Sequence, residues 1–546
     1  MRKQARALFG LAAGVVALGT TSLVQLEGTS RPDPPLGTSS SQEYLTNGWL
    51  RSAVFYFYAL PIYSQYKLTE WWFDGRPYQE SKKYYEFLHE RHCDTVEHVC
   101  LLLKGFYLKG AQVASTRDDL IPKQYLTFCK RCQDEVPTEL ADKTLLESTI
   151  CRSLGISDIH EVFDYIDCVP IGAASIGAVH KAKLKDGRVV AVKVQYPDIE
   201  TRFKNDLTTV KTFCSFALPS HVPFLEEIER QFLTEFNYVA EAENLDKIRK
   251  NVLPSWRKHI YIPYVVKELC TKDVMVMEFL QGKNLLKSVV SQYERYAAEQ
   301  GLTLKQLAEK NTSERTNSGA ASLASQAAKS YVAKKALQLR DLSKNGCRLL
   351  YNLTLSKVNG TSLQYQWSEY PINLARVLEI LMHVHAYEIF RNGVFNADPH
   401  PGNIMLLEDG RIGLIDYGQV KEMPLDKRLK FAQLIVYLAT NKDKSVVQHA
   451  TTKMGLRTKN MNHDMIYKIL AFFNDRDTDD ITGGRNIQQF LDWQNAVDPI
   501  TTLDDSYVMV GRVAILLRAL GNAFNLKLRV SPYWRSEAQK LLDKHS

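Results

Sequence analysis

The chain has 546 residues, of which 45% are hydrophobic and 24% charged, with a formal net charge of +8. This length and composition fit one large two-lobed globular protein or two to three ordinary domains. The positive charge is small and spread along the chain, so it does not indicate a nucleic-acid-binding protein. The nine cysteines stand at irregular spacing, which excludes a disulfide framework of the secreted kind.

Residues 1–48 are interpreted as a targeting or anchor segment followed by a linker. Three basic residues within the first six positions precede an apolar run, Leu8–Leu26. A mitochondrial or plastid presequence, a secretory signal and a single membrane anchor all fit this pattern. We favour organelle targeting with membrane attachment, and expect a mitochondrial, inner-membrane-associated protein, with the plastid as the alternative.

Residues 49–163 are predicted to form a helical extension. The aromatic stretch Val54–Tyr63, interrupted by Pro61, favours a helix packed on the main body over one resting at a membrane interface. Ser81–Ser115 has the spacing of one long helix or a pair, and helical spacing continues through Asp118–Val136 and Leu145–Phe163.

This extension also contains a lone CxxC, Cys129–Cys132. Cys93 and Cys100 could be imagined as partners in a zinc site. A tetrahedral zinc site needs four ligands, and the spacing does not assemble them, so ordinary buried or surface thiols are favoured.

Residues 164–282 have the pattern of a kinase N-lobe. Alternating apolar positions predict three strands, a helix is expected over Phe224–Arg249, and two further strands follow. The predicted strands are Ile166–Ile171, Ala178–Leu184, Val189–Val194, Val265–Cys270 and Val274–Leu280.

Residues 283–372 are interpreted as an insertion, with 288–345 of low complexity and one or two weak helices expected there. A clear helix, Asn373–Phe390, then opens a mostly helical C-lobe over 373–546. The predicted fold is therefore α+β, an atypical protein-kinase-like two-lobed fold with an N-terminal helical extension.

The stretch Asn396–Gly418 carries the strongest chemical signal. Asp398 and Asn403 have the spacing of a kinase catalytic loop, and Asp416 opens an Asp-Tyr-Gly where a kinase has its metal-binding Asp-Phe-Gly. Ile404–Leu407 and Arg411–Ile415 flank an Asp-Gly pair, which predicts a hairpin. Asp, Asn and Gly also simply favour turns, so this motif needs support from the rest of the chain.

Upstream residues supply that support. Lys193 near the end of a Val-rich strand fits the phosphate-binding lysine, with Glu241 on the next helix as its candidate partner. The small residues Ala173, Ala174 and Ser175 precede it in a loop that would let main-chain N–H groups approach phosphate oxygens. The main-chain groups of Glu278–Leu280 are the expected adenine contacts.

These residues resemble the UbiB/AarF family of atypical kinases. The motifs that carry the resemblance are Gln133–Pro137, the Ala-rich loop with Val179–Ala182, Ala191–Pro197 and Ala397–Asn403. The resemblance implies ATP or ADP with Mg²⁺ as cofactors, a Lys193–Glu241 ion pair, Asp398 as the catalytic-loop aspartate, and Asn403 and Asp416 as metal ligands.

The resemblance also implies a regulatory contact. In the family a Lys-x-Gly-Gln signature folds over the active site and engages a Glu-x-Asp element. Here the matching positions are Lys109–Gln112, with its glycine displaced by one, and Glu235–Asn237, with Asn237 in place of Asp. We predict that Lys109 lies within contact range of Glu235 or Asn237.

The chain lacks the segment that a protein kinase uses to hold a peptide. Few residues separate Gly418 from the next helical stretch, which is expected near Leu425, and no Ala-Pro-Glu motif follows. We therefore expect an atypical kinase or ATPase in ubiquinone, isoprenoid-lipid or mitochondrial lipid homeostasis, whose partners are a nucleotide, a lipid-like molecule and a membrane surface, and not nucleic acid. The alternatives are a nucleotide-gated lipid-binding or scaffold pseudokinase and a peptide-directed protein kinase.

Overall fold

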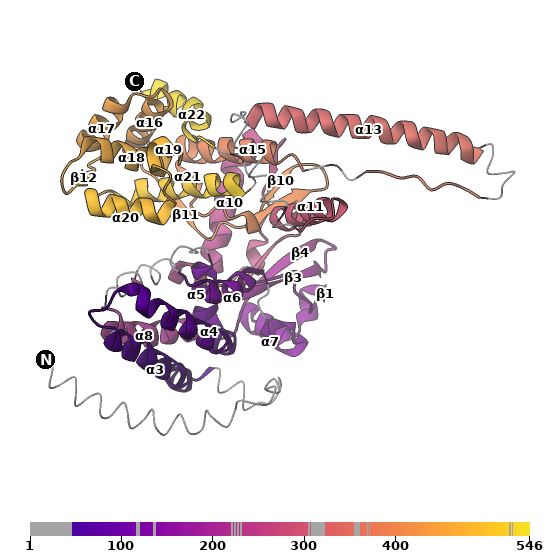
Figure 1. The fold of residues 1–546 in the computed structure, drawn as a ribbon. Coiled ribbons are helices and arrows are strands. Elements are labelled where there is room, and N and C mark those ends of the chain that lie inside the picture. The colour runs from indigo at the N-terminus through magenta and orange to yellow at the C-terminus, as the bar shows by residue number, and fades with distance from the viewer. Residues whose placement is uncertain are drawn as a thin grey trace. The chain divides into compact units, whose positions relative to one another are not determined.

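The structure is a computed structural model in which two compact units are distinguished (Figure 1). The first unit comprises residues up to Gly187 together with Val192–Phe236, and the second comprises Arg188–Ala191 and Asn237–Ser546. The division falls inside the predicted N-lobe. Apart from isolated positions, the described residues are 46–115, 121–134, 138–219, 232–303, 323–353, 361–368, 372–523 and 528–545.

Helices make up most of the first unit. Helix α3 (Gly48–Trp72) packs against α4 (Tyr78–Leu103) and α8 (Ile199–Ala217). The buried Arg51 of α3 forms an ion pair with Asp206 of α8, with a nitrogen–oxygen distance of 2.5 Å. The prediction of a helix packed on the body is confirmed, although Pro61 lies inside this helix and does not end it.

The predicted helices of the extension are largely confirmed. Ser81–Ser115 is a pair, α4 and α5 (Gly105–Ala114), and the next two are α6 (Lys123–Asp134) and α7 (Lys143–Leu154). Helix α7 ends earlier than expected because Gly155 takes a left-handed conformation with φ of 69°.

Three antiparallel strands complete this unit. Strand β3 (Gly177–Leu184) pairs with both β1 (Phe163–Ile166) and β2 (Gly172–Ala173). The prediction of a strand over Ile166–Ile171 is wrong, because β1 ends where that segment begins. The pairing with β3 is interrupted over Cys168–Pro170: the Asp167 N–H donates to Lys181 O and the Ile171 N–H to Val179 O, each at 2.8 Å, and Pro170 between them has no N–H to donate. Strand β4 (Val189–Gln195) is as predicted and is divided between the two units.

The second unit begins with α10 (Tyr238–Trp256) and β6 (Val274–Glu278). The predicted strand Val265–Cys270 is wrong: Val265 forms only an isolated bridge to Met277, and Lys267–Leu269 is a 3₁₀ turn, η6. Main-chain N–H groups at this turn bond within the turn rather than to a neighbouring strand: the Leu269 N–H donates to Val266 O at 3.0 Å and the Cys270 N–H to Lys267 O at 3.1 Å.

A four-stranded sheet of order β5-β10-β9-β7 follows in the same unit. Its outer strands are β5 (Ile260–Tyr261) and β7 (Gly282–Asn284). The insertion contains α11 (Leu285–Glu299) and α13 (Leu323–Leu353). Helix α13 is 31 residues long, which is more regular structure than the weak helices expected there.

The C-terminal part of this unit is helical around a core under α15 (Leu374–Ala386) and the π-helical turn η7 (Tyr387–Asn392). Trp534 is fully buried and its indole N–H donates to Met382 O at 3.1 Å, which fixes the last helix on α15. The α+β, mostly helical prediction is confirmed. The remaining elements are α16 (Leu425–Ala439), α17 (Asp443–Thr452), β12 (Arg457–Thr458), α18 (His463–Asn474), α19 (Asp479–Thr482), α20 (Ile487–Val497), β13 (Ile500–Thr502), α21 (Asp505–Ala523) and α22 (Ser531–His545).

Across the part of the chain that the structure describes, each helix is too short or too polar to cross a membrane. The apolar run Leu8–Leu26 lies outside the described residues.

Candidate active site

The predicted hairpin forms as expected. Strands β9 (Ile404–Leu407) and β10 (Ile412–Leu414) are antiparallel, with Ile412 opposite Leu406. Gly410 in the turn has φ of 86°, a conformation that favours glycine.

Two loops that flank this hairpin are fixed by main-chain hydrogen bonds. Strand β8 (Val394–Asn396) pairs with β11 (Val420–Glu422), which holds the start of the first loop against the end of the second. Ile415 N–H donates to Asn403 O at 3.2 Å, which ties the two loops together at their other ends. The side chains between these anchor points are therefore held at defined positions.

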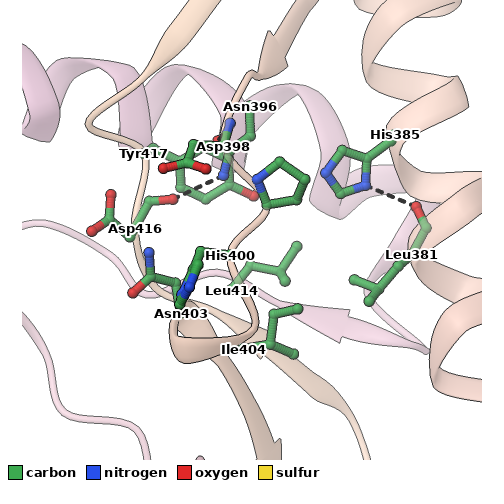
Figure 2. A pocket seen from close by; sticks show the side chains of 11 residues that line it. Leu381, His385, Asn396, Asp398, His400, Asn403, Ile404, Leu414, Asp416 and Tyr417 are labelled. Atoms are coloured by element: carbon green, nitrogen blue, oxygen red, sulfur yellow. Dashed lines mark hydrogen bonds between the residues drawn. The ribbon is translucent and has the colours of Figure 1, made fainter. Parts of the chain in front are cut away.

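Asp398, Asn403 and Asp416 line one pocket of the second unit (Figure 2). Figure 2 shows the three side chains directed to the same side of the loops. The Asp416 carboxylate is oriented by Gly418 N–H, which donates to its Oδ1 at 2.9 Å. The structure thus brings together the three residues that the sequence predicted as the catalytic aspartate and the metal ligands.

Asn396 connects the two loops behind this pocket. Its side-chain Oδ1 accepts from Asp398 N–H at 2.9 Å, and its Nδ2 donates to Asp416 O at 3.0 Å. Its own N–H donates to Glu388 Oε2 at 3.2 Å. The Asn396 carboxamide supplies both the donor and the acceptor for this link.

A buried acid, Glu388 of η7, lies behind Asn396. It is fully buried, and its Oε1 has no hydrogen-bond partner. Burial raises the pKa of the Glu388 carboxyl to about 8, against a smaller opposing effect of the Asn396 N–H. The side chain is therefore held chiefly in its neutral form at neutral pH.

His385 forms part of the pocket wall. Its Nδ1 donates to Leu381 O at 2.8 Å, and its Nε2 has no partner. Burial lowers the pKa of His385 to about 4, so the imidazole is neutral and Nε2 carries a lone pair. Sequence reasoning missed Glu388 and His385, because an acid and a histidine near a helix end are ordinary surface features.

Sequence reasoning also missed Arg512 of α21. Its Nη2 lies 3.6 Å from Asp398 Oδ1, and its Nη1 donates to Gln419 Oε1 at 3.4 Å. Both charged side chains are about one third exposed, so this is a screened interaction. No motif in the sequence marks this arginine.

Glu241 lies close to the second loop. It is buried on the first turn of α10, and a Cβ added at Gly418 would lie 3.4 Å from Asp416 Oδ1 and 3.7 Å from Glu241 Oε2. Gly418 therefore lies against both carboxylates. Lys193 is on β4 in the first unit and partly exposed, so its predicted pairing with Glu241 of the second unit stays a prediction.

The Ala-rich loop belongs to the first unit. Ala174 N–H donates to Gly177 O at 2.8 Å, which closes the loop, and Ser175 is buried. Ala173 packs against a buried cluster to which Leu108 and Ala111 of α5 contribute. The loop and the Lys109–Gln112 helix therefore share one core.

Thiols fill part of that core. Cys129 and Cys132 of α6 are buried in it, and Cys100 of α4 packs against them. Burial raises the pKa of the Cys100 thiol to about 12, which favours the protonated, unreactive form. In the described residues no three His, Cys, Asp or Glu side chains are arranged to hold a metal ion.

The expected adenine contacts are main-chain groups of the second unit. The Glu278 N–H donates to Tyr264 O at 2.9 Å, and the Phe279 N–H donates to Val189 O at 3.2 Å. The Glu278 carboxylate accepts from the Tyr261 hydroxyl at 2.9 and 3.0 Å. The contact of Glu278–Leu280 main-chain groups with an adenine stays a prediction.

The predicted contact of Lys109 is present within the first unit. Lys109 Nζ lies 3.0 Å from Glu235 Oε2, and it also lies 4.5 Å from the centroid of the Phe232 ring. The prediction of contact between Lys109 and Glu235 is confirmed. Gln112 instead donates to Cys132 O at 2.9 Å, and Asn237 caps α10 by accepting from Ala240 N–H at 3.2 Å.

The residues of the pocket fit a magnesium ion by their chemistry. Mg²⁺ prefers oxygen ligands and is commonly held by one or two carboxylates together with substrate phosphates. Asp416 and Asn403 supply a carboxylate and an amide oxygen, and Asp398 faces the same side of the loops.

The chain was compared with known proteins. Residues 131–316 and 351–450 match the ABC1 atypical kinase-like domain, which is more than half of the chain. The chain belongs to this family. The match includes the predicted phosphate-binding, catalytic and metal-binding residues, and the resemblance inferred from the motifs is confirmed.

Relatives with this domain come from animals, bacteria and plants. The chain is 23% identical over 386 residues to AarF domain-containing protein kinase 1 of Gallus gallus, covering 68% of this chain and 58% of that one. It is 32% identical over 184 residues to the probable protein kinase UbiB of Tolumonas auensis, covering 32% of this chain and 33% of that one. The chain thus spans less than two thirds of the length of these relatives.

A solved structure of Rv3197 with erythromycin, from Mycobacterium tuberculosis, aligns with 82% of this chain and 98% of its own at 20% identity. The TM-score of that alignment is 0.40.

Proposed function

We propose that this ABC1-family chain binds ATP or ADP with Mg²⁺ at the Asp398–Asn403–Asp416 pocket and transfers or hydrolyses the terminal phosphoryl group. The observation that carries this proposal is the convergence of these three side chains in one pocket. Phosphoryl transfer depends mainly on positioning and on neutralising charge, and this residue set can supply both.

Each residue is given one role in the proposal. Asp398 would accept the proton of the attacking hydroxyl or water, and Asn403 and Asp416 would hold the metal. Lys193 would bind the α- and β-phosphates, with Glu241 as its partner. A bound Mg²⁺ would neutralise charge on the phosphate oxygens.

The substrate is proposed to be water or a small lipid-like molecule, in ubiquinone, isoprenoid-lipid or mitochondrial lipid homeostasis. Support comes from the short connection after the metal-binding loop: β11 pairs with β8 directly after Gly418, and α16 begins at Leu425. This leaves little chain for a peptide-docking segment. A relative named a chloroplastic ABC1 kinase agrees with a role in an organelle.

Thermal shift with nucleotide, in the presence and absence of Mg²⁺, tests the proposal. The wild-type protein should be stabilised more by ATP with Mg²⁺ than by ATP alone, and Asp416→Asn should lose that difference. Asp409→Asn is the matched control, because Asp409 lies in the turn of the same hairpin and bonds only to Arg411 among the described residues. A Mg²⁺-independent response of the wild type would overturn the proposal.

A second candidate is a nucleotide-gated lipid-binding or scaffold protein with negligible turnover. The ion pair of Arg512 with Asp398 favours it, because the guanidinium competes for the oxygen that would accept a proton. ATP hydrolysis that is lost in Asp398→Asn but kept in Asp409→Asn would exclude this candidate.

A further inference from the structure

Helix α13 lies between the two segments that match the family domain. The match stops at residue 316 and resumes at 351, whereas α13 spans Leu323–Leu353. The role of this helix therefore has to be inferred from its own residues. At 1.5 Å per residue, its 31 residues extend over roughly 45 Å.

An extended segment, residues 361–368, runs back along α13. Asn352 and Asn345 each hold one residue of this segment through a pair of hydrogen bonds, to Leu363 at 2.8 and 2.8 Å and to Gln366 at 2.8 and 3.0 Å. Asp341 accepts from Ser368 N–H at 2.7 Å. These bonds define a structured unit, α13 with residues 361–368, which is called the arm below (Figure 1).

The face of α13 beside the one that holds residues 361–368 carries an exposed apolar stripe. Its members recur at intervals of three, four, seven and eight residues, which places them on one helical face. Their exposed fractions lie between 46% and 68%. They are Tyr331, Val332, Leu339, Leu342, Leu349 and Leu353. The returning segment adds the exposed aromatic residues Tyr365 and Trp367.

The charges of α13 are almost all positive. The helix has six Lys or Arg residues and one acid, Asp341, which is buried and bound to Ser368. Exposed charge on this helix is therefore basic. Lys335 lies within the apolar stripe, four residues from both Tyr331 and Leu339, and the other basic residues lie on the remaining faces. Such a combination is typical of helices that lie in the interface of an anionic membrane, where lysine stems extend toward the head groups.

We propose that the arm docks on the surface of a bilayer that contains anionic lipids. The apolar stripe would enter the boundary between head groups and acyl chains, and Tyr365 and Trp367 suit the same depth. A second copy of the chain is a poorer occupant, because two arms of the same positive charge repel each other. This proposal goes beyond the nucleotide chemistry and does not depend on it.

A reporter on the apolar stripe tests the proposal in the full-length chain. Cys347 is the one exposed cysteine of the nine, so Cys347→Ser with Leu342→Cys directs an environment-sensitive fluorophore to the stripe. Vesicles of phosphatidylcholine with about a third phosphatidylserine should shift its emission to the blue, and pure phosphatidylcholine vesicles should not. The matched control carries the fluorophore at Ile487→Cys, an exposed position on α20, and should not respond.

The fluorophore at position 342 reports only on the surroundings of the stripe, so binding of lipid by another part of the chain does not produce the expected signal. If the protein sediments with anionic vesicles while the reporter at position 342 stays unchanged, the proposal is wrong. It is also wrong if the protein does not bind these vesicles. An emission shift without vesicles that grows with protein concentration would indicate a second copy as the occupant and would overturn it as well.

Charge reversal tests the electrostatic part. Lys329 and Lys344 are exposed on α13. Lys329→Glu and Lys344→Glu should each weaken the reporter response to anionic vesicles by about fivefold or more. Leu339→Ser with Leu349→Ser should reduce it at every salt concentration, whereas the lysine effect should disappear in high salt. Equal responses of all variants would contradict docking through this face.

Discussion

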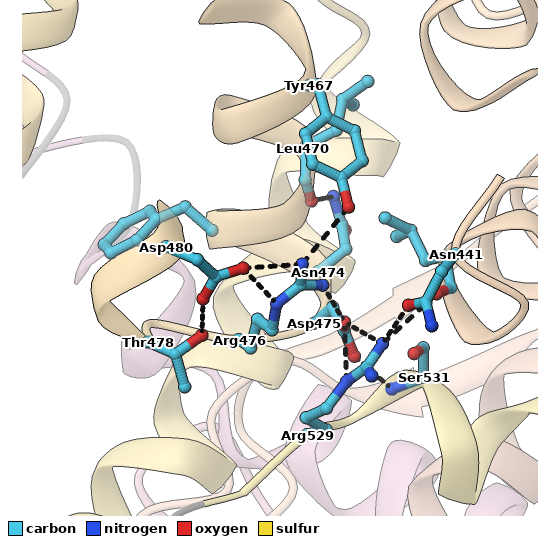
Figure 3. Close-up of polar contacts among 12 residues, drawn as sticks. Asn441, Tyr467, Leu470, Asn474, Asp475, Arg476, Thr478, Asp480, Arg529 and Ser531 are labelled. Carbon is cyan, nitrogen blue, oxygen red and sulfur yellow. Dashed lines mark hydrogen bonds and ion pairs between the residues drawn. The ribbon is translucent and has the colours of Figure 1, made fainter. Parts of the chain in front are cut away.

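Two fully buried acids in the second unit, Asp475 and Glu388, differ in how their carboxyl groups are stabilised. Asp475, at the end of α18, remains paired: Arg476 and Arg529 each have a nitrogen 2.9 Å from its Oδ2, and Ser531 N–H donates to its Oδ1 at 3.0 Å (Figure 3). Glu388, behind the catalytic loop, accepts one main-chain hydrogen bond and has one oxygen without a partner.

The difference follows from what each acid does. Asp475 joins the end of α18 to the segment that starts α22, and Arg529 also reaches Leu438 O at the end of α16, so charge is used to hold three helix ends together. Among the described residues Glu388 has no ion pair with Lys or Arg, and burial disfavours its charged form. One acid is therefore neutralised by arginine and the other by a proton.

The largest effect is expected from Asp475→Ala. Removing the acid leaves Arg476, which is only 12% exposed on its side chain, and Arg529 without their shared partner. Breaking a buried pair from one side costs about 3–5 kcal/mol. Amide hydrogen exchange should show that the opening free energy of α22 falls by that amount.

Asp480→Ala is the control for this change. Asp480 pairs with the same Arg476, but its side chain is 57% exposed. Its removal should cost less than about 1 kcal/mol, because exposed ion pairs contribute little. Equal losses in both variants would contradict the assignment of Asp475 as the central acid.

The next effect concerns pH and Glu388→Gln. The folded pKa of Glu388 is raised to about 8, so its contribution to stability is fully present below the unfolded pKa and is lost as pH rises through 8. Between about pH 4.5 and 8 the wild type should lose stability relative to Glu388→Gln, on the order of 1 kcal/mol per pH unit, and the difference should level off above pH 8.

Measuring the difference between the two proteins removes the contribution of His385. The pKa of His385 is lowered to about 4, so its protonation destabilises the fold only as pH falls below its unfolded value, and it does so in both proteins. Urea unfolding at several pH values gives the comparison. Parallel pH profiles would show that Glu388 is not held as a neutral acid.

The contrast also shows what the sequence could predict. Local spacing predicted that Asp398, Asn403 and Asp416 lie around one hairpin, and this arrangement forms because the contacts are local in the chain. Arg512 could not be predicted, since its approach to Asp398 depends on the packing of a distant helix.

The other misses also have physical causes. One wrong strand lies where a bend at Cys168–Pro170 interrupts the pairing with β3, and the other lies where a 3₁₀ turn at Lys267–Leu269 satisfies the backbone locally. Helix α13 was underestimated because its Ser, Ala and Lys residues read as low complexity, while its apolar positions are spaced too widely to dominate the composition.

The smallest effect is expected for Glu235, an acid that is neither fully buried nor fully exposed. Lys109 and Glu235 form a pair in the first unit with side chains 21% and 17% exposed. A double-mutant cycle with Lys109→Met and Glu235→Gln should give a coupling free energy of about 0.2–1 kcal/mol, since solvent screens the pair. Lys109→Arg should keep most of this coupling, because the cation also faces the Phe232 ring. A coupling as large as the loss in Asp475→Ala would mean that this pair is desolvated in the working protein.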